Sequence, residues 1–149
     1  MKRRILLPLA VGVACLAACA GDPPAPEPEP ETGEAVEQPA REALASGERA
    51  LVRYAPVPDP IPLNTHFELS VEVMDAQAPE RPLEGVDVFV SGWMPAHLHG
   101  MPTDPVTEER GGGLYDVKGM LFQMPGHWQI HVDVVQDGIA SRATFDVHL

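Results

Sequence analysis

The chain has 149 residues and a formal net charge of −12, with 22 acidic residues against 10 basic ones. Nucleic-acid binding needs a basic patch that neutralises phosphates, so this charge argues against a nucleic-acid partner. Both cysteines, Cys15 and Cys19, lie near the start of the chain. The region after them therefore has no disulfide and no thiol chemistry.

Residues 1–18 have the pattern of a secretory signal peptide. A basic start at Lys2 to Arg4 is followed by an apolar stretch, and Leu16-Ala17-Ala18 forms a small-residue cleavage site. Cys19 follows directly, an arrangement that resembles the bacterial lipobox, in which the cysteine is acylated and becomes the mature N-terminus. We therefore expect a lipid anchor on Cys19 that holds the protein at a membrane of the cell envelope, facing the periplasm or the exterior. The alternative is an ordinary secretory signal that is cut nearby.

Residues 19–48 are rich in Pro, Glu, Ala and Gly and carry no aromatic residues. Such a composition cannot offset the entropy cost of ordering the chain, so we expect a disordered, acidic, Pro-rich tether. A weak helix near residues 40–45 is the one local element that the sequence allows there. The remaining residues, 49–149, have the size of one folded domain.

The 49–149 segment shows the alternation of apolar and polar residues that is typical of half-buried β-strands. The apolar positions expected to face the core are Phe67, Leu69, Val71, Val73, Val86, Val88, Val90, Trp128, Ile130, Val132, Val134, Ala143, Phe145 and Val147. A turn at Asp137-Gly138 predicts that the last two strands form a hairpin. Residues 51–54 suggest an edge strand, because Pro56 and the prolines after it do not suit a central strand.

The stretch 114–122 changes its alternation at Gly119. Tyr115 and Val117 share one parity, whereas Met120 and Phe122 share the other. A β-bulge at Gly119 would bring both pairs to the core face. With about seven strands and no crossover helices, the sequence predicts an all-β fold, an immunoglobulin-like antiparallel β-sandwich.

The stretch 93–102 contains the strongest chemical signal. It places His97 and His99 two residues apart, with Met94 and Met101 on either side. In an extended segment the two histidines would point the same way, about 7 Å apart at Cα. Imidazole suits several transition metals and thioether sulfur selects mainly Cu(I), so this set predicts copper, with Cu(I) favoured. The alternative is a buried loop in which the histidines make ordinary hydrogen bonds and the core is filled by Trp93, Met94, Leu98 and Met101.

A second Met and His, Met124 and His127, flank a Pro-Gly turn. If the strands alternate in direction, this loop emerges at the same end as the stretch 93–102, because two strands separate them. The predicted metal ligands are His97, His99, Met94, Met101, Met124 and His127. The other histidines are expected to lie on the surface or too far away to share the ion: His66, His131 and His148.

Three runs of residues together resemble a known family. They are Met94-Pro95-Ala96-His97-Leu98-His99-Gly100-Met101, Gly113-Leu114-Tyr115 and Gly119-Met120-Leu121-Phe122-Gln123-Met124-Pro125-Gly126-His127-Trp128. They resemble the YtkA-like domain, which is similar to FixH-type periplasmic domains, over residues 64–149. The resemblance implies an immunoglobulin-like sandwich displayed outside the cytoplasmic membrane, with copper handling and assembly of respiratory or redox complexes as recurrent suggested roles. Leu98 stands where the family commonly has Gly, and Gln123 where a His can occur, so a ligand is lost and the loop is stiffer.

Two classes of function remain open. One is an envelope-anchored lipoprotein that binds copper or delivers it to a copper or redox protein of the envelope. The other is a non-catalytic interaction module that docks a partner envelope protein through apolar residues of the same pole: Trp93, Met94, Leu98, Met101 and Trp128. We do not expect an enzyme, because the domain has no thiol nucleophile, no Gly-x-Ser-x-Gly motif and no His-Glu-x-x-His motif.

Overall fold

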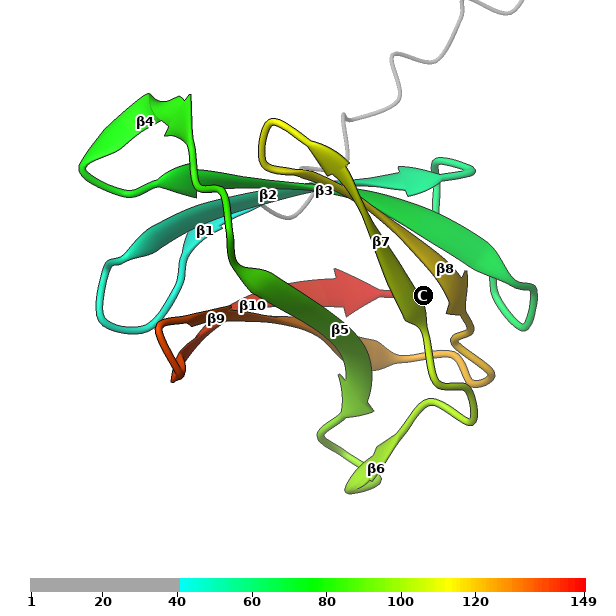
Figure 1. Ribbon diagram of the computed structural model, residues 1–149. Helices are drawn as coiled ribbons and strands as arrows, with labels where there is room; N and C mark the ends of the chain where they lie inside the picture. The colour runs from blue at the N-terminus through cyan, green and yellow to red at the C-terminus, as the bar shows by residue number, and fades with distance from the viewer. Residues whose placement is uncertain (1–40) are drawn as a thin grey trace, which may run out of the picture. The chain divides into compact units, whose positions relative to one another are not determined.

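The structure is a computed structural model and describes residues 41–149 (Figure 1). Ten β-strands and no helix lie in this part of the chain. The strands are β1 (Glu42–Leu44), β2 (Ala50–Val57), β3 (Phe67–Asp75), β4 (Ala78–Pro82), β5 (Asp87–Met94), β6 (His99–Gly100), β7 (Val106–Gly111), β8 (Leu114–Met120), β9 (His127–Gln136) and β10 (Ile139–His148). All pairings are antiparallel, which confirms the predicted fold class.

The strands form two sheets that pack face to face. One sheet has the order β1-β2-β3-β8-β7, with β4 paired to β3, and the other has the order β10-β9-β5-β6. In Figure 1 the first sheet is the upper layer and the second is the lower layer. The core between them contains every residue that the alternation pattern assigned to it. The period of two in the sequence therefore located both inner faces correctly.

The ordered domain begins earlier than the predicted boundary at residue 49. Glu42–Leu44 forms β1, which pairs with β2, where the sequence predicted a tether or a weak helix. The Glu42 carboxylate also accepts a hydrogen bond from Arg53 Nε at 2.5 Å. Because β1 covers the outer edge of β2, the prediction that β2 is an edge strand was wrong. A three-residue strand is too short to show an alternation that sequence analysis could detect.

β2 also continues through Pro56, which the sequence placed at its end. Tyr54 donates its backbone N–H to Arg41 O on the β1 side of the strand. Pro56 is two residues later and so faces the same side, beyond the end of β1. Among the described residues no strand lies opposite the N–H that proline lacks, so no ladder hydrogen bond of this part is lost.

The bulge expected at Gly119 is present in β8. Gly119 has a φ of +87°, a conformation that glycine adopts without steric cost. Leu69 of β3 faces Val117, but Phe67, two residues earlier, faces Met120, so β8 carries one extra residue. Met120 is fully buried as a result.

Several predictions concern residues outside the described part of the chain. They are the signal peptide, the acylated Cys19 and the tether as far as residue 40. Within residues 41–149, no helix is long and apolar enough to cross a membrane.

Candidate metal-binding site at the loop pole

The two Met/His loops lie at the same end of the sandwich. We call this end the loop pole: residues 93–102, which contain β6, and residues 121–128, which lead into β9. The Met94 Cε atom lies 3.0 Å from the position that a Cβ at Gly126 would occupy. Trp128 Nε1 donates a hydrogen bond to Met124 O at 2.8 Å. The up-and-down order of the strands thus brings the two loops into contact, as the sequence indicated.

A tight turn connects β5 to β6. Met94 O accepts hydrogen bonds from the backbone N–H groups of His97 at 3.1 Å and Leu98 at 3.0 Å. Leu98 has a φ of +55°, the left-handed region that favours glycine, and its side chain is 78% exposed. This is the position where the resemblance places a Gly. The turn therefore keeps its shape with Leu98, at some cost in backbone strain.

The turn presents two imidazoles side by side. The ring centroids of His97 and His99 are 5.8 Å apart. His99 Nδ1 lies 2.8 Å from Gly100 O and must be the donor, because a carbonyl oxygen only accepts. This bond fixes the tautomer and leaves the Nε2 lone pair of His99 available to bind a metal. His97 is exposed, so its ring can turn toward the same point.

The aromatic rings of Trp128 and Phe122 lie on the core side of the turn that carries the histidines. Trp128 is fully buried, and it stacks on Phe122 with ring centroids 4.6 Å apart and an interplanar angle of 18°. Phe122 reaches this place because residue 92 is glycine. A Cβ there would lie 2.5 Å from Phe122 Cε1 and 3.3 Å from Met101 Sδ. Gly92 therefore lets both side chains approach the β5 backbone.

The three methionines of the predicted ligand set differ in exposure. Met94 is 2% exposed and belongs to the core, as the packing alternative predicted. Met101 and Met124 are half-buried and pack against the edge of that core. Of the three methionines, these two have side chains that are partly open to solvent.

His127 lies in a different group of side chains. Its Nε2 is 2.6 Å from Asp146 Oδ1, and its ring stacks on His148 with centroids 4.8 Å apart. The bond from His127 lowers the pKa of Asp146, and a second bond from Gln129 lowers it further. Sequence analysis did not pair His127 with His148. The two-residue turn of the predicted hairpin could have done so, because it sets these residues opposite each other.

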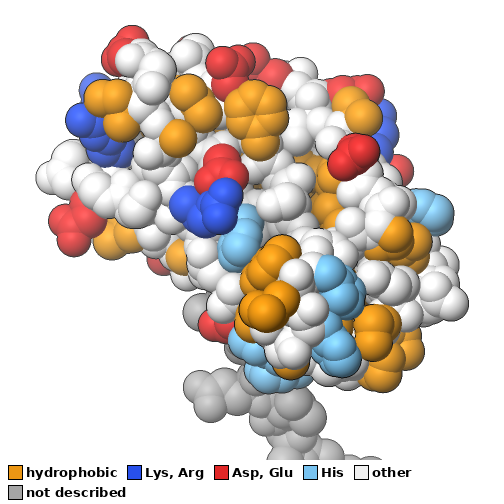
Figure 2. Space-filling model, turned by 90° about the horizontal axis from the view of Figure 1, so that it is seen from below, with side chains coloured by type: hydrophobic (Ala, Val, Ile, Leu, Met, Phe, Trp, Pro, Cys, Tyr) orange, Lys and Arg blue, Asp and Glu red, His pale blue; other side chains and the backbone are white. Residues whose placement is uncertain are grey.

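The donor set limits which metals fit. Within residues 41–149, no three side chains of His, Cys, Asp or Glu are arranged to hold one ion. Structural and catalytic zinc sites need at least three such ligands. The donors that the loop pole does offer are the imidazoles of His97 and His99 and the thioethers of Met101 and Met124, and thioether sulfur binds mainly Cu(I). Figure 2 shows histidines gathered around hydrophobic side chains on one face of the molecule.

A comparison with protein families identifies the domain. A family model described as YtkA-like matches residues 55–133. The chain belongs to this YtkA-like family. The match begins in β2 and ends in β9, so it includes the whole loop pole. It also confirms the resemblance drawn from the three sequence runs. No curated protein and no solved structure matches the chain.

Proposed function

We propose that this YtkA-like domain is a copper-binding protein, not an enzyme, and that it holds Cu(I) at the loop pole. The imidazoles of His97 and His99 and the thioethers of Met101 and Met124 would supply the ligands. The observation that carries the proposal is the histidine pair, with centroids 5.8 Å apart, at the end of a domain whose core packs against the half-buried Met101 and Met124.

The surroundings of the pair suit a soft, dehydrated ion. His99 is oriented by its bond to Gly100 O, which supports metal binding through Nε2. The buried side chains of Trp128 and Phe122 form an apolar surface on the core side of the pair, which limits access of water from that side. Thioether sulfur is neutral at every pH and binds Cu(I) far better than hard ions. Copper bound here would stay near the surface, where a partner protein could take it.

The proposed site leaves out two of the six ligands that the sequence predicts, Met94 and His127. Met94 is almost fully buried beneath Gly126, and His127 is held by Asp146 and His148. We further propose that acylation of Cys19 anchors the chain at the cell envelope, so that the domain serves a copper or redox protein there. The support for the anchor is the Leu16-Ala17-Ala18-Cys19 sequence.

The second candidate function is a docking module at the same pole. Its support is Leu98, whose apolar side chain is 78% exposed at the tip of the turn. Trp93 is half-buried, but Met94 and Trp128 are buried and could not meet a partner without rearrangement. The apolar surface is therefore smaller than the sequence suggested, and copper binding takes first place.

A Cu(I) titration against a competing chelator tests the proposal. The protein is residues 19–149 with Cys19→Ser, so that no thiol competes for the ion. We expect one Cu(I) per chain, and a loss of affinity of at least about tenfold in the His97→Ala, His99→Ala double variant. Met101→Leu and Met124→Leu keep the apolar volume and should also weaken binding.

Two control variants make the result specific. His66→Ala with His131→Ala removes two histidines that lie outside the His97/His99 pair, and it should leave the affinity unchanged. Met94→Leu removes the buried sulfur and should also have little effect. If Cu(I) affinity survives the His97/His99 and both Met→Leu changes, the loop pole is a packing or docking surface and the copper proposal is wrong.

A further inference from the structure

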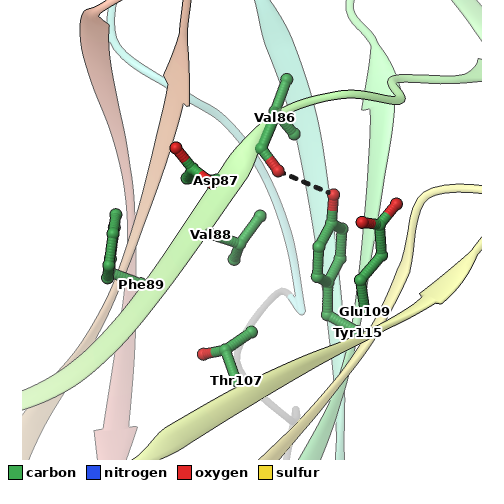
Figure 3. Close-up of a pocket in the computed structure, with 7 residues that line it drawn as sticks. All are labelled: Val86, Asp87, Val88, Phe89, Thr107, Glu109 and Tyr115. Atoms are coloured by element: carbon green, nitrogen blue, oxygen red, sulfur yellow. Dashed lines mark hydrogen bonds between the residues drawn. The ribbon is translucent and has the colours of Figure 1, made fainter.

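The edges of the two sheets leave a groove along one side of the sandwich. A recess of about 210 Å³ lies between β5 of one sheet and β7 and β8 of the other (Figure 3). A second recess of about 300 Å³ adjoins it and shares Val88, Phe89 and Thr107 with the first. Together they follow the first half of β5, as far as Val90. On the other side of the groove is β7, the last strand of its sheet.

Two hydrogen bonds show which backbone groups of β5 point into this groove. Gly92 O accepts a bond from Met101 N at 3.2 Å, on the side of β5 away from β9. Val86 O accepts a bond from the Tyr115 hydroxyl at 3.3 Å, which Figure 3 shows reaching across the groove. Alternate residues of a strand direct their N–H and C=O groups to the same edge. The even-numbered residues between Val86 and Gly92 therefore face the groove.

Those residues are Val88 and Val90. β6 pairs only with Trp93 and Met94, so it does not reach them, and β7 pairs only with β8. Within residues 41–149, no strand pairs with this edge of β5 between Asp87 and Gly92. The N–H and C=O groups of Val88 and Val90 therefore have no strand partner within the described residues, but the two residues are each 6% exposed, so an added strand would have to enter the groove to reach them.

The groove is acidic at one end. Glu109 lies beside Tyr115 (Figure 3). Asp87 lies on the face of β5 opposite to that of Val88. Burial raises the pKa of Tyr115, and the negative charges of Glu109, Asp87 and Glu84 raise it further. The Lys and Arg side chains of residues 41–149, apart from Arg49, form ion pairs with other carboxylates: Arg41, Arg53, Arg81, Arg110, Lys118 and Arg142. The acidic charge at the groove is therefore not neutralised within the described residues.

We propose that the free edge of β5 binds an extended, basic segment of another protein, which adds to the sheet as a strand beside Val88 and Val90. Its backbone would supply the missing hydrogen bonds, as in other cases of strand addition. Its Lys or Arg side chains would lie against Asp87 on one face and Glu109 on the other. A second copy of this chain is a poor occupant, because two chains with a net charge of −12 repel each other.

The probe for this site is a synthetic peptide of alternating Lys and Val, acetylated and amidated at its ends. It is titrated into the ¹⁵N-labelled Cys19→Ser protein, residues 19–149, while NMR follows the backbone amides. We expect saturable shifts centred on Val88 and Val90, and slower amide exchange at these two residues in particular. Neighbouring Phe89 pairs with β9 and should change less.

Variants and control peptides separate backbone pairing from simple charge attraction. The double change Asp87→Asn, Glu109→Gln should weaken the peptide roughly tenfold. Glu108→Gln is the matched control, because Glu108 is adjacent in β7 but pairs with Lys118, and it should have little effect. A peptide with N-methylated Val residues, which cannot donate hydrogen bonds, should not bind.

Other outcomes would overturn the proposal. Equal binding of the N-methylated peptide would mean that charge alone attracts it. Shifts centred on the loop pole or on β10 would place the site elsewhere, and the absence of saturable shifts would mean that this edge accepts no strand. Protection of Val88 and Val90 that grows with protein concentration alone would identify a second copy as the occupant.

Discussion

His99 packs edge-on against the buried Trp128, with ring centroids 5.9 Å apart and an interplanar angle of 70°. One face of the proposed copper site is therefore part of the hydrophobic core. The same indole stacks on Phe122 and donates its N–H to Met124 O, both in the second loop, so with His99 it contacts both loops of the pole. The position of His99 depends on core packing as well as on the turn that carries it.

Replacing Trp128 should be costly for stability. Trp128→Ala removes a fully buried side chain, and we expect the free energy of unfolding to fall by about 3–5 kcal/mol. Urea unfolding followed by circular dichroism measures this loss. Trp93→Ala is the matched control: Trp93 is half-buried on β5, so its loss should cost less than half as much. Equal losses for the two variants would contradict the assigned core.

The turn at Leu98 offers a stabilising change. Leu98→Gly removes the strain of a positive φ and gives up a side chain that is mostly exposed. We expect the free energy of unfolding to rise by up to about 1 kcal/mol. Leu114→Gly is the control, because Leu114 begins β8 and has no positive φ; there glycine should destabilise the protein. A loss of stability in both variants would mean that Leu98 contributes through packing.

How far the sequence predicted this fold depends on the length of each element. Long strands with clear alternation, such as β3 and β9, were assigned with their correct inner faces, and so was the bulge at Gly119. Four elements of six residues or fewer, β1, β4, β6 and β7, were not located from the sequence. Short strands depend on the strands beside them, and that tertiary information is not visible in a local pattern.

The candidate site was predictable only in part. Spacing of two residues indicated that His97 and His99 could act together, and strand order indicated that the second loop would join them. The methionines differ in burial, since Met94 lies in the core. The motif alone does not show this difference. The His127 side chain instead contacts Asp146 and His148 on the outer face of β9 and β10. Only the hairpin register reveals that grouping.

Stability should depend on pH through His131. Burial lowers its pKa, and the nearby positive charge of Arg142 lowers it further, against a smaller opposing effect of Asp133. The unfolded chain therefore takes up a proton first as the pH falls below about 6.5. Stability should decline from there until the pH reaches the lowered pKa of the folded state.

The matching variant is His131→Gln, which cannot take up a proton. Unfolding curves at a series of pH values from about 7.5 to about 5 should show a smaller loss of stability for the variant than for the native residue. Parallel curves across this range would contradict the lowered pKa of His131.

The anchor proposal has its own test. Cys19→Ser should abolish acylation and release the protein from the membrane fraction of cells that express it with its signal peptide. Metabolic labelling with a palmitate analogue, followed by fractionation, measures both effects. If the native chain is recovered unlabelled and wholly soluble, Cys19 is not the anchor. The copper proposal would be unaffected, since it concerns the folded domain alone.

X-ray absorption spectroscopy of the Cu(I)-loaded Cys19→Ser protein can show whether histidines and methionines of the loop pole hold copper together, because it distinguishes sulfur from nitrogen among the atoms bound to the metal. The account predicts both histidine nitrogen and thioether sulfur around one ion. The sulfur contribution should diminish in Met101→Leu and Met124→Leu, and the nitrogen contribution in the His97→Ala, His99→Ala variant. A spectrum with nitrogen and oxygen alone, or one that none of these changes alters, would show that copper does not bind at the loop pole.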